Sequence, residues 1–125
     1  MKTFSDWLAS RGVPRDCIDK LLELLPHSAD LFETPERIMH SDCWFSYPFN
    51  SRFVLLGSCP NGDAVAIDTA DQPGAIFFID HERVHDDIPD SERAARVANS
   101  LTDYVQSCLD DPDFPYDYHE AKNRA

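Results

Sequence analysis

The chain has 125 residues, of which 42% are hydrophobic and 27% are charged, the composition of an ordinary globular protein. A single core commonly extends over about 100–150 residues, so this length predicts one domain over residues 1–125. Its 23 acidic and 11 basic residues give a net charge of −12 at pH 7, which repels the phosphate backbone of nucleic acids. No apolar run reaches the ~18–20 residues of a membrane span. We therefore expect neither nucleic acid nor a membrane as a partner.

The N-terminus and the cysteines favour a cytoplasmic, reducing environment. The segment from Met1 to Trp7 lacks the apolar stretch and the cleavage site of a secretory signal. The four cysteines, Cys17, Cys43, Cys59 and Cys108, include no C-x-x-C pair of the kind that zinc ribbons and redox motifs require. We expect free thiols and no cofactor.

Three short helices are expected in the N-terminal third. The first covers residues 4–11, whose aromatic and leucine side chains recur at the spacing of one helix face. The second covers residues 14–25, where apolar residues return every three or four positions until Pro26 prevents continuation. Thr34, followed by proline, is a typical cap for a third helix of one or two turns. The aromatic segment 44–49 is then expected to be extended.

The middle of the chain carries the clearest pattern, three β-prone runs separated by turns. Strands are expected near residues 53–58, 63–68 and 75–80. Asn61-Gly62 is the strongest short hairpin signal because both residues tolerate positive φ, and Pro73-Gly74 suits a type II turn. These features predict an antiparallel meander.

One long helix is expected over residues 90–109, because apolar side chains return at steps of three and four on one face. Its predicted buried residues are Val97, Leu101, Tyr104 and Val105. Two aspartates at its C-terminal end oppose the helix dipole, and nothing in the sequence explains how they would stabilise the helix. The strands and helices together predict an α+β fold with a central, largely antiparallel sheet flanked by helices.

The C-terminal stretch, residues 112–125, is rich in proline, aspartate and tyrosine and has no period. We expect this tail to dock partly on the domain through its aromatic side chains. Residues 122–125 are expected to fray.

One segment matches a zinc-protease motif letter for letter. His81-Glu82-Arg83-Val84-His85 reads H-E-x-x-H, which binds zinc when one helix face presents both histidines and the glutamate acts as general base. Here the segment follows a predicted strand and precedes Pro89, so one helix face is not expected to hold both ligands. The sequence favours a solvated polar segment without metal. Adventitious metal binding and zinc-dependent hydrolysis remain the alternatives.

Acidic residues gather at the predicted turns and strand ends. Between positions 63 and 87 they are Asp63, Asp68, Asp71, Asp80, Glu82, Asp86 and Asp87. Their spacing does not match a calcium-binding loop, and no nucleophile elbow or glycine-rich phosphate loop accompanies them. A solvated acidic rim is the plain interpretation, an exposed surface for a basic protein is the functional one, and metal or acid–base chemistry is a third. We therefore expect no catalytic residue. The candidate partner-binding residues are Asp63, Asp68, Asp71, Asp80 and Glu82, together with Trp44 and Tyr47, whose alternative role is core and edge packing.

Several short motifs occur together in a fixed order. They are Leu55-Leu56-Gly57, Gly62-Asp63, Ile67-Asp68, the run from Gly74 to Ile79, and Val97-Ala98-Asn99-Ser100-Leu101-Thr102-Asp103-Tyr104-Val105. Through this order, from about Trp44 to Leu109, the chain resembles the SUKH superfamily, which includes bacterial toxin-immunity proteins and the yeast cell-wall-synthesis regulator. It departs from that family at Leu101, where an aromatic residue is common, and at Pro60-Asn61 in the first glycine-rich turn. The N-terminal third does not align.

The resemblance implies a SUKH-like α+β domain that binds a protein instead of catalysing a reaction. In bacteria such proteins typically neutralise polymorphic toxins, many of them nucleases. The net charge agrees, because an acidic domain attracts a basic partner. We therefore expect a non-catalytic immunity protein for a basic toxin. The alternatives are a small-ligand-binding or scaffold domain and a zinc-dependent hydrolase.

Overall fold

The computed structural model describes residues 3–27, 31–40, 52–84, 86–115 and 117–124. The strands are β1 (Phe53–Ser58), β2 (Ala64–Asp68), β3 (Ile76–Ile79) and β4 (Ala94–Ala98). The helices are α1 (Phe4–Ser10), α2 (Arg15–Leu24), α3 (Pro35–Met39), α4 (Leu101–Asp110) and α5 (Tyr118–Arg124), and the 3₁₀ turns are η1 (Leu25–His27) and η4 (Asp90–Glu92). The predicted α+β class is confirmed. The aromatic segment with Trp44 and Tyr47 lies outside the described residues.

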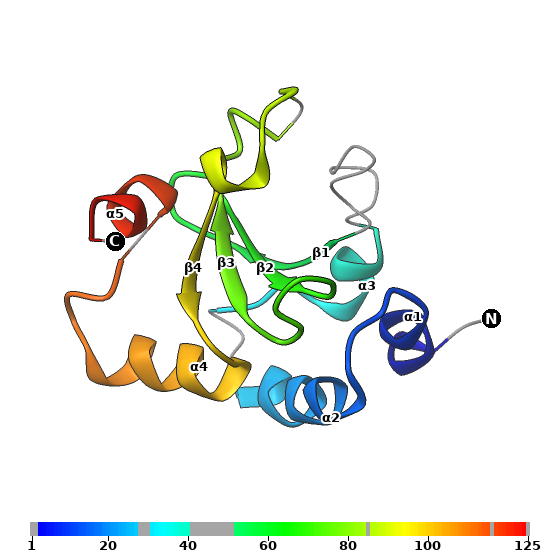
Figure 1. The fold of residues 1–125 in the computed structure, drawn as a ribbon. Helices are drawn as coiled ribbons and strands as arrows, with labels where there is room; N and C mark the ends of the chain where they lie inside the picture. The colour runs from blue at the N-terminus through cyan, green and yellow to red at the C-terminus, as the bar shows by residue number, and fades with distance from the viewer. Residues whose placement is uncertain (1–2, 28–30, 41–51, 85, 116, 125) are drawn as a thin grey trace.

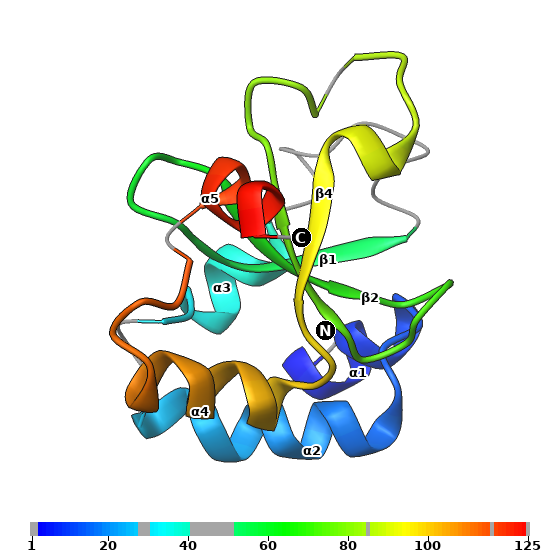
Figure 2. The same ribbon diagram turned by 60° about the vertical axis from the view of Figure 1, so that its left-hand side comes forward.

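The four strands form one sheet in the order β1-β2-β3-β4, and each neighbouring pair is antiparallel. Helices α1, α2 and α4 lie on one side of this sheet, and α5 lies beside β4 (Figure 1). Turning the molecule shows α2 and α4 side by side beneath the strands (Figure 2). The predicted three-stranded meander is confirmed, and a fourth strand extends it.

The turns of the meander depend on glycine. Gly62, between β1 and β2, and Gly74, between β2 and β3, both have φ of +96°. Side chains with a Cβ rarely adopt this conformation, so these glycines allow the chain to reverse. The reversals bring the ends of β2 close to residues from the neighbouring connections.

The three predicted N-terminal helices are confirmed, and side-chain caps fix two of their starts. The Thr3 hydroxyl accepts the backbone N–H of Asp6 at 3.1 Å, and the Thr34 hydroxyl accepts that of Arg37 at 3.3 Å. The chain before α3 runs against β1, where the N–H of Glu33 donates to the carbonyl of Leu56 at 2.7 Å. A Cβ on Gly57 would lie only 2.6 Å from a backbone oxygen of this segment, so glycine is required there.

The predicted helix over residues 90–109 is wrong in its first half. Ala94–Ala98 forms β4 and pairs with β3, whose edge would otherwise be unpaired. Helix α4 begins only at Leu101, after the Ser100 hydroxyl accepts the N–H of Asp103 at 3.1 Å. The alanine and valine residues of β4 happen to continue the helical spacing of α4, and pairing with β3 overrides that local pattern. Val97 is consequently half-buried on a strand, whereas the predicted burial of Leu101 is confirmed.

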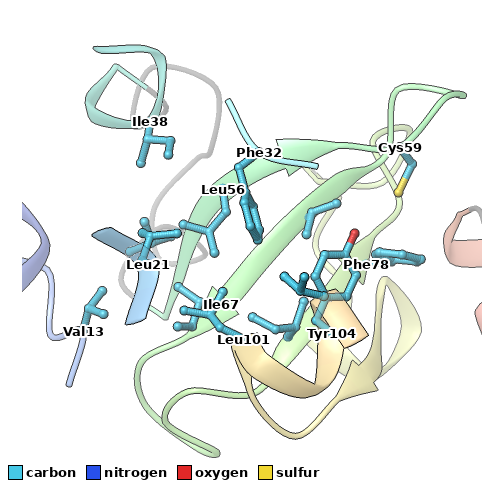
Figure 3. Close-up of a cluster of buried hydrophobic side chains, with 14 of the residues drawn as sticks. Val13, Leu21, Phe32, Ile38, Leu56, Cys59, Ile67, Phe78, Leu101 and Tyr104 are labelled. Atoms are coloured by element: carbon cyan, nitrogen blue, oxygen red, sulfur yellow. The ribbon is translucent and has the colours of Figure 1, made fainter. Parts of the chain in front are cut away.

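Both faces of the sheet are packed. The larger cluster lies between the sheet and the helices, and Figure 3 shows Leu21 and Val13 at one end of it and Phe78 and Tyr104 at the other. A smaller cluster on the opposite face includes Phe53, Ala64, Ala66, Phe77, Ile79 and Val84. All five residues of β2 are buried as a result.

The tail contains the short helix α5. Tyr118 is buried and its hydroxyl donates to the carbonyl of Glu92 at 2.9 Å, while the Lys122 ammonium donates to the carbonyl of Ser91 at 2.9 Å. These contacts attach α5 to the segment that leads into β4. Within the described ranges, no helix combines the length and the apolar content needed to cross a membrane.

The position of α4 can be tested at two of its leucines. Leu101 is 2% exposed and Leu109 is 73% exposed. Leu101→Ala should lower the free energy of unfolding by about 2–4 kcal/mol because it leaves a cavity, whereas Leu109→Ala should cost less than about 0.5 kcal/mol. Urea denaturation measures both values. Equal losses would contradict this orientation of α4.

Candidate functional site: two buried carboxylates and an acidic-edged groove

The structure divides the candidate partner-binding acids into buried and exposed residues. Asp63, Asp68 and Asp80 are at most 2% exposed, whereas Asp71 and Glu82 are exposed. The prediction that Asp63, Asp68 and Asp80 are exposed is wrong. Their carboxylates are buried because they accept hydrogen bonds from other parts of the domain. A buried carboxylate cannot contact a protein partner directly. Trp44 and Tyr47 lie outside the described residues, so nothing here places them.

Asp68, at the end of β2, closes the turn into β3. Its carboxylate accepts two hydrogen bonds from the Arg52 guanidinium, at 3.0 and 3.2 Å, and the backbone N–H groups of Ala70 and Gln72, both at 2.9 Å. Burial favours a higher pKa, but these donors outweigh it and lower the pKa of Asp68. The ionised Asp68 carboxylate therefore holds the turn between β2 and β3 in place.

Arg52 connects this turn to other parts of the domain. Its guanidinium also donates to the Asp90 carboxylate at 3.1 Å, and it lies 4.5 Å from the ring centroid of Phe53 and 5.3 Å from that of Phe77. Attraction between the cation and the two ring faces adds to the ion pairs. The same side chain thus joins the start of β1, the β2–β3 turn and η4.

Asp63, just before β2, has a corresponding role at the other end of the strand. One carboxylate oxygen accepts the N–H of His81 at 3.0 Å and lies 2.6 Å from Nδ1 of its ring. The other oxygen accepts the Asn61 amide and the N–H of Tyr118, both at 3.0 Å. Burial favours a higher pKa for Asp63, but the bonds from His81, Asn61 and Tyr118 lower it. The Asp63 carboxylate in turn raises the pKa of His81.

Asp63, Asp80 and His81 form the one possible metal-binding group among the described residues. Each offers a ligand atom, and these atoms lie within 4.8 Å of one another. His119 adds Nε2, 3.8 Å from a carboxylate oxygen of Asp80. However, the two carboxylate oxygens of Asp63 already take part in four hydrogen bonds, and one of these is with Nδ1 of His81. A cation would have to displace these bonds, so the arrangement fits a structural hydrogen-bond network better than a metal centre.

The H-E-x-x-H segment does not present its residues on a helix. His81–Val84 forms turns after β3, and His85 lies outside the described residues. Within the described part of the chain, no serine, threonine or cysteine side chain bonds to the His81 ring. The Asp63–His81 pair consequently has no visible nucleophile to activate.

A groove of about 560 Å³ lies at the C-terminal end of α4. Phe78 lies on its sheet side, Tyr104 and Cys108 come from α4, and Phe114 and Asp111 come from the connection to α5. The rings of Phe78, Tyr104 and Phe114 meet edge to face, with centroids 5.9 to 6.4 Å apart. Figure 2 shows this connection curving past the β1–β2 turn. Sequence reasoning did not find the groove, although the aspartates that oppose the dipole of α4 were a signal.

The lining of the groove is more apolar than polar, and Asp111 is the acidic residue among its described lining residues. Burial raises the pKa of Cys59 to about 12 and also raises that of Cys108, so both thiols stay protonated near neutral pH. Asp110 and Asp113 lie on either side of Asp111 in the sequence, and both are exposed. None of the described lining residues is a lysine or an arginine.

Comparison of the chain with protein-family models, with curated proteins and with solved structures returned no match. The functional assignment therefore depends on the residues and their geometry.

The contrast between buried and exposed acids predicts unequal effects of two similar substitutions. Asp68→Asn should lower the free energy of unfolding by about 3 kcal/mol, because it breaks a buried ion pair with Arg52. Asp71→Asn removes an exposed partner of the same guanidinium at 3.5 Å and should cost less than about 1 kcal/mol. Chemical denaturation of both variants is the measurement. The interpretation fails if Asp68→Asn is as mild as its control.

The lowered pKa values of Asp63 and Asp68 predict a loss of stability in acid. Their contribution is complete above the unfolded-state pKa of about 3.9 and disappears as the pH falls through the lower folded-state pKa. The urea midpoint of the wild type should therefore decrease steeply below about pH 4. In Asp63→Asn the stability at pH 6 should already be reduced, and its further decrease in acid should be smaller. An identical acid dependence of variant and wild type would contradict the role of Asp63.

Proposed function

We propose that this chain is a non-catalytic protein-binding domain that captures a basic partner, as toxin-immunity proteins of the SUKH superfamily do. The observation that carries the proposal is the acidic surface left after the internal ion pairs are formed. Many exposed acids have no ion pair with any described residue: Asp6, Asp16, Glu36, Glu82, Asp86, Asp87, Glu92, Asp103, Asp110, Asp111 and Asp113. Such a surface raises the encounter rate with a positively charged protein.

The roles of the buried polar groups also support binding over catalysis. Asp63 and Asp68 each satisfy their carboxylates with internal donors, and His81 is oriented by Asp63 without a nucleophile among the described residues. Active sites usually leave at least one such group free to meet a substrate. Here these groups hold turns and helices in place.

The motifs that suggested the SUKH superfamily have identifiable physical roles. Gly62-Asp63 directly precedes β2 and Ile67-Asp68 ends it, and both aspartates are buried and hydrogen-bonded to neighbouring turns. Leu55-Leu56-Gly57 meets the segment before α3, where only glycine fits. The last motif, residues 97–105, spans the end of β4 and the start of α4, so its support rests on its order in the sequence.

The proposal predicts a salt-sensitive association with a basic protein. The domain should capture a basic protein from cells that encode it, and that protein, if it is a toxin, should lose activity at equimolar domain. Its association rate should fall about tenfold or more between about 50 mM and 500 mM salt, because screening shortens the reach of the acidic surface. Stopped-flow or surface-based kinetics measure this rate.

An unrelated domain of equal length and net charge controls for non-specific capture. The proposed function is wrong if the specifically captured proteins are not basic, or if the association rate of the captured partner is independent of salt.

A further inference from the structure

We propose that the groove at the C-terminal end of α4 is the docking point for this partner, and that it accepts an apolar side chain flanked by lysine or arginine. The inference rests on the proposed function, because it assumes a basic protein partner. It adds the surface and the chemistry of the partner segment. Neither Asp71 nor Glu82, the exposed residues of the predicted partner surface, lines this groove.

The interior of the groove suits an apolar anchor. Its volume of about 560 Å³ is within the roughly 300–1,000 Å³ typical of binding pockets, and its inner walls include the rings of Phe78, Tyr104 and Phe114. These rings meet edge to face, and Phe114 remains half-exposed. Aromatic walls bind an inserted apolar side chain and also attract the ammonium or guanidinium group beside it.

The margin of the groove selects the charge of the occupant. Asp110 and Asp111 lie at the C-terminal end of α4, where the negative end of the helix dipole makes additional negative charge unfavourable. Asp113 adds a third carboxylate, and none of the three has an ion pair with a described residue. The Asp110 carboxylate accepts a hydrogen bond from the Gln106 amide one turn earlier, and the Asp111 carboxylate accepts the backbone N–H of Asp113 at 2.9 Å. These neutral donors leave the negative charge of the carboxylates uncompensated. A cation from a partner would neutralise both the carboxylates and the dipole.

The charge also argues against two other occupants. A second copy of the chain would bring its own net charge of −12 to a negative margin. An anionic small molecule would meet the same repulsion. A cationic, partly apolar protein segment satisfies both the interior and the margin.

Two other grooves lack this combination. One of about 490 Å³ contains Arg52, Arg96 and Lys122 together with Asp71 and Asp90, so its charges are mixed and Arg52 is already paired. Another, of about 260 Å³, is small and bordered by an ion pair between side chains near α3. Unlike these two, the groove beside α4 joins aromatic walls to an aspartate that has no ion pair with a described residue.

The first test uses the wild-type domain and three end-blocked pentapeptides. One has a tryptophan between two pairs of lysines, the second has serine in place of the tryptophan, and the third has glutamates in place of the lysines. In ¹⁵N NMR titrations the first should shift the amides of Val65, Phe78 and residues 108–111, 113 and 114. It should bind at least about fivefold more tightly than the second. The third should not bind. Shifts centred elsewhere, or equal binding of the first and third peptides, would overturn the inference.

The second test uses the captured partner and two matched double variants. Asp111→Lys with Asp113→Lys should weaken partner binding at least about tenfold. Glu82→Lys with Asp87→Lys makes the same change in net charge on the loop between β3 and β4, which lies away from the end of α4 (Figure 1), and should weaken binding less than about threefold. All four sites are exposed, and thermal melts confirm folding.

The two proposals fail separately in this experiment. If the partner is basic and its association depends on salt, but the Asp111/Asp113 variant binds it normally, the proposed function stands and the groove is not its docking point. Self-association of the domain that disappears in the Asp111/Asp113 variant would identify a second copy as the occupant and also overturn the inference. Leu109→Ala tests non-specific adhesion, since this exposed leucine does not line the groove, and it should leave binding unchanged.

Discussion

The arrangement of this domain depends on keeping two carboxylates ionised at the two ends of its most buried strand. Placing a charge inside a protein costs several kcal/mol unless hydrogen bonds and ion pairs replace its lost hydration. Asp63 and Asp68 therefore require donors from many directions. Arg52 reaches Asp68 from the segment before β1, and Tyr118 reaches Asp63 from the start of α5. The helices that cover one face supply apolar contacts, but these polar contacts determine how turns and tail meet the sheet.

This requirement also divides the acidic residues into two groups with different roles. Some aspartates serve the interior, where they act as acceptors for backbone N–H groups and for Arg52. Others remain on the surface without a described cation beside them, and only these can act on another molecule. Composition alone adds the two groups together. The two groups differ in whether the carboxylate has its hydrogen-bond donors inside the domain. The aspartates at the end of α4 belong to the exposed group.

Local signals could predict the meander, because glycine turns and short apolar runs need only neighbouring residues. They failed over residues 90–109, where alanine and valine fit a strand as well as a helix and the deciding contact is a distant strand edge. The burial of Asp68 and Asp63 was equally out of reach, since Arg52 lies 16 residues from Asp68 and Tyr118 lies 55 residues from Asp63. The groove could not be predicted either, because its walls come from α4, the sheet and the connection to α5, which only the folded domain brings together. An aspartate at each end of a wholly apolar strand was the available hint.

The connection between α4 and α5 can change in sequence without disturbing the buried carboxylates. It supplies Asp111 and Phe114 to the groove, yet it contributes none of the described hydrogen bonds that hold the carboxylates of Asp63 and Asp68. Substitutions at its exposed positions can alter the charge beside the groove while the strands keep their pairing. Under the proposed function, such substitutions would change the partner that the groove recognises and leave the fold intact. Gly57, Asp63 and Asp68 have no such freedom and are the positions at which descendants should remain alike.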